Sequence, residues 1–387
     1  MKPYVNDSIK IFCAIVFGSV VTYFYLVVYS SNGFTDNDII LTANSTHPEL
    51  LDSKISDKIV GQPPIILGWT GLFGQQLMDT FLRGLWANGM ENVAFNQSTC
   101  PYRCTYTDNR TLIPNATIVL FHVRDLDHKE LPPNNPNQLN VFFLNESPFH
   151  SHSKHTNVRT NFFNITMTYR TDSDIFVPYG SFQSIVPGVT RPEEIWKPEQ
   201  VHEKVMRKTE LAVQFVTNCH TPSHREDVTE RLQQYMNITK FGACYERPCA
   251  GDKCLEDNLE KHFFYLAFEN SVCRQYVTEK FWNIKHLVVP VVLSRMPFQG
   301  LDIPPNSFIS VDDFPDARQL AERLIYLQKN REEYIKYFEW TKSYKKSKSL
   351  NPLCELCKWA VERRRKTIDN IVDWWDNHPN GKCISNG

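Results

Sequence analysis

Short apolar runs separated by polar stretches recur along the chain from about residue 64 onward. The runs at 65–69, 117–121 and 140–144 have the length of buried strands, and a helix is predicted from Gln75 to about residue 86, after a glycine-bearing turn. Strands that alternate with helices or loops are typical of a parallel α/β sheet. The pattern therefore predicts a first α/β domain over residues 64–200.

A second set of apolar runs predicts another α/β domain over residues 201–350. Ser223 and Glu226 have the spacing of a capping box and predict a helix that continues through Tyr235. Thr278 is the predicted N-cap of a later helix. The Pro-rich interval at 186–198 separates the two domains as a plausible hinge. The other expected elements are strands at 211–216, 238–241, 263–268 and 288–293, an amphipathic helix at 317–327, and a helical tail from Cys354 to Trp375 that packs on the first domain.

Residues 11–29 form the longest apolar run and contain no charged side chain. A helix of this length covers roughly 28 Å, close to the thickness of a hydrocarbon core. Lys2 and Lys10 precede the run and Asp36 and Asp38 follow it, so the positive-inside rule places the amino terminus in the cytosol. We therefore predict a type II signal anchor rather than a cleaved signal peptide. The expected order is a cytosolic tail at 1–10, the transmembrane helix at 11–29, a luminal stem at 30–63, the two domains, and a tail at 351–387.

Charge and cysteine content narrow the class of protein. The formal net charge is −1, which argues against a nucleic-acid partner. Of the eleven cysteines, Cys13 lies in the predicted transmembrane span. The other ten are an even number on the luminal side, which suggests disulfides in an oxidising compartment. Cys354 and Cys357 could alternatively be a redox pair, or bind zinc together with Cys100 and Cys104. Sequons support the luminal prediction, and the glycosylation candidates are Asn44, Asn96, Asn109, Asn115, Asn164 and Asn237.

A polar cluster from Glu269 to Lys280 lies between two apolar runs of the second domain. A strand followed by a loop and a helix start is where α/β sheets bind phosphates, because the helix N-terminus offers free N–H groups. Lys280 adds a positive charge at that end, which indicates an anionic ligand. Arg225 could contact the same anion, or it could be an exposed Arg paired with a neighbouring carboxylate. In the first domain, Glu146 follows an apolar strand at the mouth of the sheet and is a candidate base.

Several motifs in this region are similar to those of one enzyme family. Phe264-Tyr-Leu-Ala-Phe-Glu-Asn-Ser271, then Tyr276-Val-Thr-Glu-Lys280 and Val289-Pro-Val-Val-Leu293, resemble the signature of the α1,3/4-fucosyltransferases. Glu146-Ser-Pro-Phe-His150 and Gly71-Leu-Phe-Gly-Gln75 resemble two further segments of that family. The resemblance implies a GT-B fold, with two Rossmann-like domains facing a cleft. It also implies a Golgi membrane enzyme that transfers L-fucose from GDP-fucose to O3 of GlcNAc on a glycan or glycoprotein, with inversion.

The same resemblance assigns roles to single residues. Glu146 is the expected catalytic base, and Trp69 or Gln75 would touch the acceptor. No metal or other cofactor is expected to be required, although a divalent cation could stimulate the reaction. Cys354 and Cys357 would bond back to early cysteines, for which Cys100 and Cys104 are the candidates. The expected donor-binding residues are Arg225 and Lys280 at the phosphates, Glu279 at the fucose, and Asn270 and Tyr276 along the pocket.

Asp172 and Asp174 leave a different function open, because they match the Asp-x-Asp pattern of metal-dependent GT-A transferases. The stretch around them resembles another fucosyltransferase segment, so we expect these carboxylates to be structural or to line the cleft. The alternatives are a GT-A transferase of another nucleotide sugar and an inactive glycan-binding protein. Cys273, Cys383 and the charged loop at 246–257 depart from the family pattern.

Overall fold

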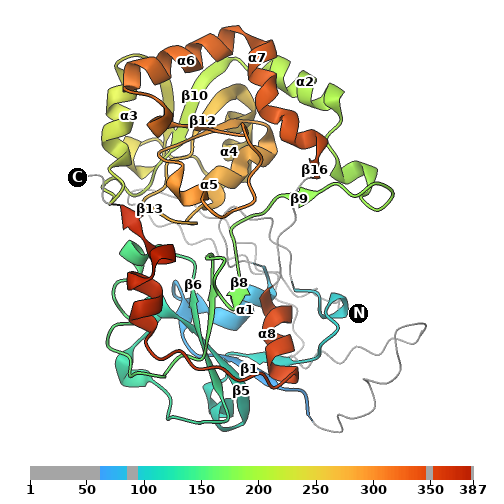
Figure 1. Ribbon diagram of the computed structural model, residues 1–387, viewed down its shortest axis with the longest axis vertical. Coiled ribbons are helices and arrows are strands. Elements are labelled where there is room, and N and C mark those ends of the chain that lie inside the picture. Colours follow the sequence, from blue (N-terminus) through green and yellow to red (C-terminus); the bar gives the residue numbers. More distant parts are fainter. Residues whose placement is uncertain (1–61, 85–94, 346–351, 385–387) are drawn as a thin grey trace, which may run out of the picture. The chain divides into compact units, whose positions relative to one another are not determined.

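The computed structural model describes residues 62–84, 95–345 and 352–384 (Figure 1). The predictions of a cytosolic tail, a span at 11–29 and a stem, together with Cys13 and Asn44, lie outside the described residues. Within the described ranges, no helix combines the length and the apolar character needed to cross a bilayer.

The first half of the described chain forms a six-stranded sheet in which all neighbouring strands are parallel. The predicted strands are found within one residue of their expected bounds, because their apolar side chains fill the core on both faces of the sheet. In spatial order the strands are β4 (Thr105–Thr107), β1 (Ile65–Gly68), β5 (Ala116–His122), β6 (Leu139–Leu144), β7 (Ile165–Thr168) and β8 (Ile175–Phe176).

The second half forms a five-stranded sheet that is also parallel throughout. Its spatial order is β11 (Ile238–Phe241), β10 (Glu210–Phe215), β12 (His262–Leu266), β14 (Val289–Val292) and β15 (Ile309–Ser310). The remaining strands form antiparallel pairs: β2 (Gly71–Leu72) with β3 (Gln75–Gln76), β9 (Gln183–Ser184) with β16 (Tyr344–Lys345), and β13 (Val272–Cys273) with β17 (Cys383–Ile384).

Helices contact both sheets, and α8 follows the second half in sequence yet lies against the first sheet, beside β1 and β5 (Figure 1). That packing agrees with the expectation that the tail returns to the first half. The helices are α1 (Leu77–Leu82), α2 (Pro198–Arg207), α3 (Arg225–Gln233), α4 (Gly251–Lys261), α5 (Glu279–Trp282), α6 (Ala317–Lys329), α7 (Arg331–Ile335) and α8 (Pro352–Val361).

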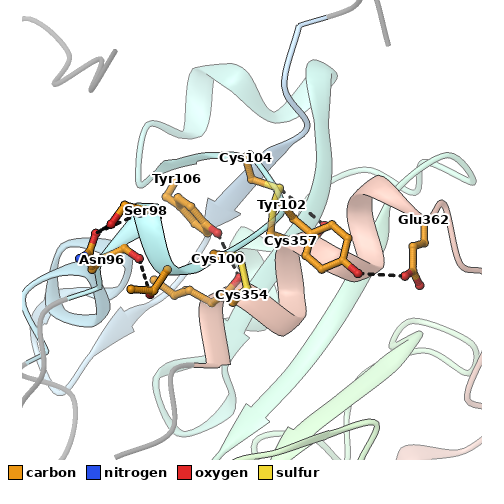
Figure 2. Close-up of a disulfide and its surroundings, with 11 residues drawn as sticks. Asn96, Ser98, Cys100, Tyr102, Cys104, Tyr106, Cys354, Cys357 and Glu362 are labelled. Atoms are coloured by element: carbon orange, nitrogen blue, oxygen red, sulfur yellow. Dashed lines mark hydrogen bonds between the residues drawn. A yellow bond between two sulfur atoms is a disulfide. The ribbon is translucent and has the colours of Figure 1, made fainter. Parts of the chain in front are cut away.

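Two disulfides join α8 to the segment that leads into β4, as Figure 2 shows. They link Cys100 to Cys354 and Cys104 to Cys357, so these four cysteines form disulfides rather than a zinc site. Tyr106 adds a hydrogen bond from its hydroxyl to the Leu353 carbonyl at 3.1 Å (Figure 2). The other disulfides are Cys219–Cys244, Cys249–Cys254 and Cys273–Cys383.

The predicted capping box of α3 is wrong. Helix α3 starts at Arg225, after His224 with a left-handed φ of 49°. Ser223 Oγ donates to the Glu269 carbonyl at 2.7 Å instead, and the Glu226 carboxylate accepts from Thr221 N at 3.0 Å. Both polar side chains therefore stabilise the loop before the helix, because tertiary partners compete with the local cap.

Other boundaries also differ from the predictions. The helix expected from Gln75 begins only at Leu77, because Gln75 and Gln76 form β3. Part of the charged loop expected at 246–257 is helical, since α4 begins at Gly251. The tail is helical only to Val361 and then changes direction at Arg363, which has φ of 53°, before a single π turn at Asp373–Asn377. A run of charged residues follows Val361, and it offers no apolar face to bury.

Candidate active site

A cavity of about 370 Å³ is lined by residues of the first sheet and its loops, and by residues of the loop and the helix start that follow β12 of the second sheet. Glu146 follows β6 and Asn270 follows β12, so the cavity lies where carboxyl ends of parallel strands meet, as is usual for ligand sites of α/β sheets. The predicted site residues that line this one cavity are Gln75, Glu146, Asn270, Tyr276, Glu279 and Lys280.

Glu146 is held by two groups on the same carboxylate oxygen. The Tyr276 hydroxyl donates to Oε2 at 3.4 Å, and Nη1 of Arg124 lies 3.9 Å from it. The Glu146 side chain is 22% exposed, so a molecule in the cavity can reach its carboxylate. This geometry suits a group that accepts a proton from a bound hydroxyl.

The residues next to Glu146 and Asn270 also contact each other. Ser147 Oγ donates to Ser271 Oγ at 2.8 Å, and both side chains are fully buried. His150 Nδ1 lies 3.1 Å from the first hydroxyl and 3.2 Å from the second. These contacts hold the candidate base and the candidate donor loop, which are distant in sequence, at a fixed separation.

Lys280 is surrounded by carboxylates of its own chain. Its Nζ lies 2.8 Å from Glu279 Oε1 and 3.4 Å from Glu269 Oε2, and it donates to Thr278 Oγ1 at 3.0 Å. Burial works against its charge, but Glu269 and Glu279 outweigh burial and raise the pKa of Lys280. Two carboxylates of the chain therefore already compensate the charge of this lysine, and the expectation that it binds a ligand anion stays a prediction.

Thr278 occupies the predicted N-cap position, directly before α5. Its side chain does not cap the helix, because its hydroxyl donates to Glu269, 2.8 Å from one carboxylate oxygen and 2.7 Å from the other. The Thr278 N–H also donates to Glu269 Oε1 at 2.8 Å. Glu269 thus organises the start of α5, and burial raises the pKa of this carboxyl.

Arg225 does not line the cavity of Glu146 and Lys280. It lines a second cavity of about 680 Å³, which shares no lining residue with the first, and it is only 4% exposed. Nη1 donates to the Phe268 carbonyl and Nη2 to the Asn218 carbonyl, both at 2.9 Å. Its Nε is buried without a hydrogen-bond partner among the described residues, and burial lowers the pKa of the guanidinium. Arg225 therefore ties together the segments that follow β10 and β12.

The two acceptor-side candidates lie in different surroundings. Gln75 is exposed and lines the cavity of Glu146. Trp69 does not line it: Nε1 donates to the Glu130 carbonyl at 2.8 Å, and the Arg110 guanidinium lies 4.7 Å from the ring centroid. The structure therefore brings Gln75, but not Trp69, to the candidate base.

Asp172 and Asp174 both bind cationic or donor groups of the protein. Asp172 accepts from Arg170 at 2.9 and 2.5 Å. Asp174 accepts from Thr166 N at 2.9 Å and lies 2.6 Å from Lys366 Nζ. These contacts give the pair a structural role in holding β7 and the C-terminal segment.

Three further residues of the cavity region escaped the sequence analysis: His122, Arg124 and Tyr179. His122 and Arg124 come at the end of the long apolar run that forms β5, which is the same signal that drew attention to Glu146. Tyr179 donates from its hydroxyl to the Asn145 carbonyl at 2.6 Å and fixes the backbone just before Glu146. Nothing in the sequence pairs Tyr179 with that carbonyl.

The glycosylation candidates differ in accessibility. Asn96, Asn109, Asn115 and Asn237 are exposed. The amide of Asn164 is engaged at both ends, since Oδ1 accepts from Asn140 N at 2.7 Å and Nδ2 donates to the Lys366 carbonyl at 3.1 Å. A glycan on Asn164 would replace one of the two hydrogens of Nδ2, the atom that makes the second of these bonds.

Comparisons with known proteins give matches to fucosyltransferases along most of the chain. The family model "Fucosyltransferase, N-terminal" matches residues 61–180, and "Glycosyltransferase family 10 (fucosyltransferase) C-term" matches residues 205–374. Alpha-(1,3)-fucosyltransferase fut-5 of Caenorhabditis elegans is 33% identical over 303 residues, which cover 72% of this chain and 76% of that protein. Alpha-(1,3)-fucosyltransferase C of Drosophila melanogaster is 30% identical, with 81% of this chain and 77% of that protein covered.

Solved structures are similar in fold. A crystal structure of an α1,3-fucosyltransferase has a TM-score of 0.52 at 15% identity and covers 81% of this chain and 94% of its own. A structure described as that of an α1,3-fucosyltransferase with GDP-fucose has a TM-score of 0.50 at 16% identity, with 84% and 96% covered. At these identities, the similarity to the solved structures is one of fold.

Proposed function

The chain belongs to glycosyltransferase family 10, the fucosyltransferases, as its signature indicated, and we propose that it transfers L-fucose from GDP-fucose to O3 of an N-acetylglucosamine on a glycan. The observation that carries this proposal is the single cavity shared by Glu146 and by Asn270, Tyr276, Glu279 and Lys280. A base and an anion-binding cluster in one cavity meet the needs of a transfer between a nucleotide sugar and a hydroxyl group. The two parallel sheets support a GT-B arrangement of the two halves.

In the proposed reaction, Glu146 takes the proton of the acceptor 3-hydroxyl as that oxygen attacks C1 of the fucose. The bond between C1 and the phosphate oxygen breaks on the opposite face, which inverts the anomeric configuration. GDP leaves with one additional negative charge. Tyr276 and Arg124, which contact one oxygen of Glu146, hold the carboxylate in one orientation during the transfer.

The donor is proposed to bind through Lys280 and Arg225. Lys280 keeps its charge, because two carboxylates raise its pKa, and it can stabilise the charge that develops on the leaving diphosphate. Arg225 has an unpartnered Nε among the described residues and lines the second cavity, in which we propose that the nucleotide binds. Asn270 and Tyr276 would line the path, and Glu279 would contact the fucose.

A metal ion is not required in this proposal. Cations of the chain would neutralise the leaving group, a role that GT-A enzymes usually give to a metal. Asp172 and Asp174 bind Arg170, Thr166 and Lys366, so the metal-dependent alternative has no support from their contacts. Within the described part of the chain, no group of three or more His, Cys, Asp or Glu residues could hold a metal ion.

The proposed location is the Golgi membrane, with the two sheets in the lumen. The disulfides support an oxidising compartment, and the exposed sequons of Asn96, Asn109, Asn115 and Asn237 fit it. The apolar run at 11–29 is the proposed single-pass anchor, with the segment at 30–63 as stem. The acceptor would then be a glycan of a secretory glycoprotein, either its core or an antenna.

The full-length chain incubated with GDP-fucose, and separately with UDP-sugars, tests the function. We expect fucose transfer from GDP-fucose to a 4-galactosyl-N-acetylglucosaminide, the acceptor in the name of a relative from Homo sapiens that is 32% identical, or to chitobiose. EDTA should leave most of this activity intact. Preference for a UDP-sugar would overturn the proposal, and binding of glycans without transfer from any donor would favour the inactive glycan-binding protein.

A further inference from the structure

A further cavity, of about 280 Å³, is lined mostly by apolar side chains, and we call it the apolar cavity. Among the described residues, it shares no lining residue with the cavity of Glu146 or with that of Arg225. The proposed reaction makes no use of it. The side chains that give it its apolar character include those of Phe176, Phe182, Val277, Trp282, Leu301 and Ile303.

A thin wall separates the apolar cavity from the cavity of Glu146. Two segments form it, residues 178–180 and residues 275–277. In each segment the central residue, Tyr179 or Tyr276, lines the cavity of Glu146, and the residues on both sides of it line the apolar cavity. The two cavities therefore lie on opposite sides of the same backbone.

The two tyrosines of this wall also hold the candidate base. The Tyr179 hydroxyl donates to the Asn145 carbonyl at 2.6 Å, and the Tyr276 hydroxyl donates to Glu146 Oε2 at 3.4 Å. Their rings pack edge-on, with 6.3 Å between the centroids. A molecule that presses on the wall from the apolar cavity therefore acts on the groups that orient Glu146.

Helix α5 extends the wall and faces both cavities. Lys280 lines the cavity of Glu146, and Trp282 lines the apolar cavity. Residues two positions apart on a helix point in roughly opposite directions. The backbone of Gly180 lies directly against the Trp282 indole, which leaves no room for a Cβ on that glycine. Contacts made with Trp282 in the apolar cavity are therefore passed to the turn that carries Lys280.

The polar groups of the apolar cavity are largely satisfied by one another. Gln275 Nε2 donates to Thr171 Oγ1 at 2.8 Å, and Gln275 Oε1 accepts from Thr171 N at 2.9 Å. These bonds hold Gln275 at φ of 63°, a conformation that residues other than glycine seldom adopt. Among the described residues that line the cavity, Asp302 is the only charged one, and it is exposed.

The volume and the lining together indicate the class of ligand. Ring faces and branched side chains with few free polar groups suit a neutral aromatic compound. An apolar cavity of about 150 Å³ can hold one benzene molecule. The larger volume of the apolar cavity suits a compound of two fused rings.

We propose that the apolar cavity binds a small neutral aromatic molecule and that this molecule strengthens the binding of GDP. Its contacts with Gln275, Val277 and Trp282 stabilise the wall in the conformation that places Tyr276 and Lys280 in the donor site. By linkage, GDP strengthens the binding of the aromatic molecule by the same factor. The effect on GDP rests on the proposed function, whereas the binding of the aromatic molecule does not.

Calorimetry on the full-length protein tests the proposal, with indole as the probe. Indole should bind to the wild type, and saturating indole should lower the Kd of GDP at least about fivefold, the lower end of typical coupling between sites. Ile303→Ala removes apolar contacts from the cavity. It should weaken indole binding at least about fourfold, the value of one buried methylene group.

Two further variants form a matched pair. Ser181 lines the apolar cavity and is half-buried, so Ser181→Phe should fill the cavity and abolish indole binding. Ser184 lies three residues further on, in β9, where it is exposed and does not line the cavity. Ser184→Phe should therefore bind indole as the wild type does. Ile303→Ala shortens a side chain and keeps the test decisive if Ser181→Phe does not fold.

Several results would overturn the proposal. If the wild type does not bind indole, or if Ser181→Phe and Ile303→Ala both bind it unchanged, the cavity is not its site. Unchanged GDP affinity in the presence of indole would contradict the coupling, and weaker GDP binding would indicate competition in the donor site. Binding of methyl β-galactoside that Ser181→Phe abolishes would assign the cavity to a sugar instead. Failure of the proposed function is a separate result, namely that the wild type does not transfer fucose from GDP-fucose.

Discussion

Glu146 and Lys280 lie in one cavity with opposite charges, and each is held by its own set of neighbours. Tyr276 and Arg124 contact the glutamate, whereas Glu269, Glu279 and Thr278 contact the lysine. At the scale of single residues, this separation has a consequence. Replacing one of the two charged side chains should change one step, either proton removal or donor binding, and leave the other largely intact.

Glu146→Gln should reduce turnover by at least 10²-fold, since removal of a positioned base typically costs about 10²–10⁴-fold in rate. The amide can still accept from the Tyr276 hydroxyl, so folding and GDP affinity should be preserved. Steady-state kinetics with GDP-fucose and calorimetry with GDP measure the two effects. Glu332→Gln, on an exposed position of α7, is the control. More than a tenth of wild-type turnover in Glu146→Gln would exclude the base role.

Lys280→Ala should weaken GDP binding by about 1.5–3 kcal/mol, the value of a charge-assisted hydrogen bond. It should also lower the melting temperature, because Glu269 is only 8% exposed and would lose its cation. Calorimetry with GDP and thermal unfolding are the measurements. Lys336→Ala removes a comparable pair with Glu333 at the surface and should change neither. Wild-type GDP affinity in Lys280→Ala would remove this lysine from the donor site.

At the scale of elements, a buried lysine holds the carboxyl end of α4. Lys208 Nζ donates to the carbonyls of Leu259, Glu260 and His262, at 3.0, 3.2 and 2.9 Å. The last carbonyls of a helix lack intrahelical partners, so these contacts satisfy groups that would otherwise be buried without one. They join α4 and the start of β12 to the segment before β10.

Lys208→Met should destabilise the fold by about 1–3 kcal/mol, because it leaves those carbonyls unpaired. Burial lowers the pKa of Lys208 to about 7 in the native state, against about 10.4 in an unfolded chain. Between these values the unfolded state binds more protons, so the unfolding free energy contributed by Lys208 rises with pH. Denaturant unfolding at several pH values should show that rise in the wild type and in the exposed control Lys261→Met, but not in Lys208→Met. Identical slopes in all three would contradict the assignment.

The elements could be predicted where burial alone decides them. The strands from Ala116 and Leu139 fill cores with apolar runs, and their bounds followed from those runs. The start of α3 could not be predicted in the same way. Ser223 has the chemistry of a cap, but it bonds to Glu269, a contact that depends on how distant segments pack.

The residues of the candidate site can also be divided into those that the sequence predicts and those that it does not. Residues in motifs, such as Glu146 and Lys280, were predicted from the sequence and are found in one cavity. The family resemblance placed Trp69 on the acceptor side, yet its ring packs beside Arg110 and does not line the cavity. His122 was missed, since nothing in the sequence shows that a histidine at the end of a strand lines the cavity.

At the scale of the whole described chain, the C-terminal segment contacts residues that follow β7 of the first sheet and residues that follow β12 of the second sheet. Arg170 donates to the carbonyl of Trp374 at 2.8 Å, and Trp375 is fully buried near Tyr169. Further on, β17 pairs with β13, and Arg274 N donates to the Lys382 carbonyl at 2.9 Å. The Cys273–Cys383 disulfide therefore fastens this segment beside the donor loop that carries Asn270 and Tyr276.

Replacing Cys273 and Cys383 together by serine should lower both stability and GDP affinity. A loop of 110 residues closed by this disulfide corresponds to about 5 kcal/mol in the chain-entropy model. The control, a Cys249→Ser and Cys254→Ser double variant, opens a loop of five residues, worth about 2 kcal/mol, away from the donor loop. Thermal unfolding and GDP calorimetry distinguish them. Unchanged GDP affinity in the first variant would limit the disulfide to a purely stabilising role.

The disulfides of α8 have a consequence for how the protein is made. Cys100 and Cys354 are separated by 254 positions, and Leu353 and Leu356 complete the apolar cluster that contains Ile66 and Ile118. At roughly 5–20 residues per second, a nascent chain waits on the order of 10–50 seconds for this helix after Cys100 leaves the ribosome. The first sheet therefore cannot close its apolar face during its own synthesis. A chain released before residue 352 would expose that face to chaperones, rather than form an independent half.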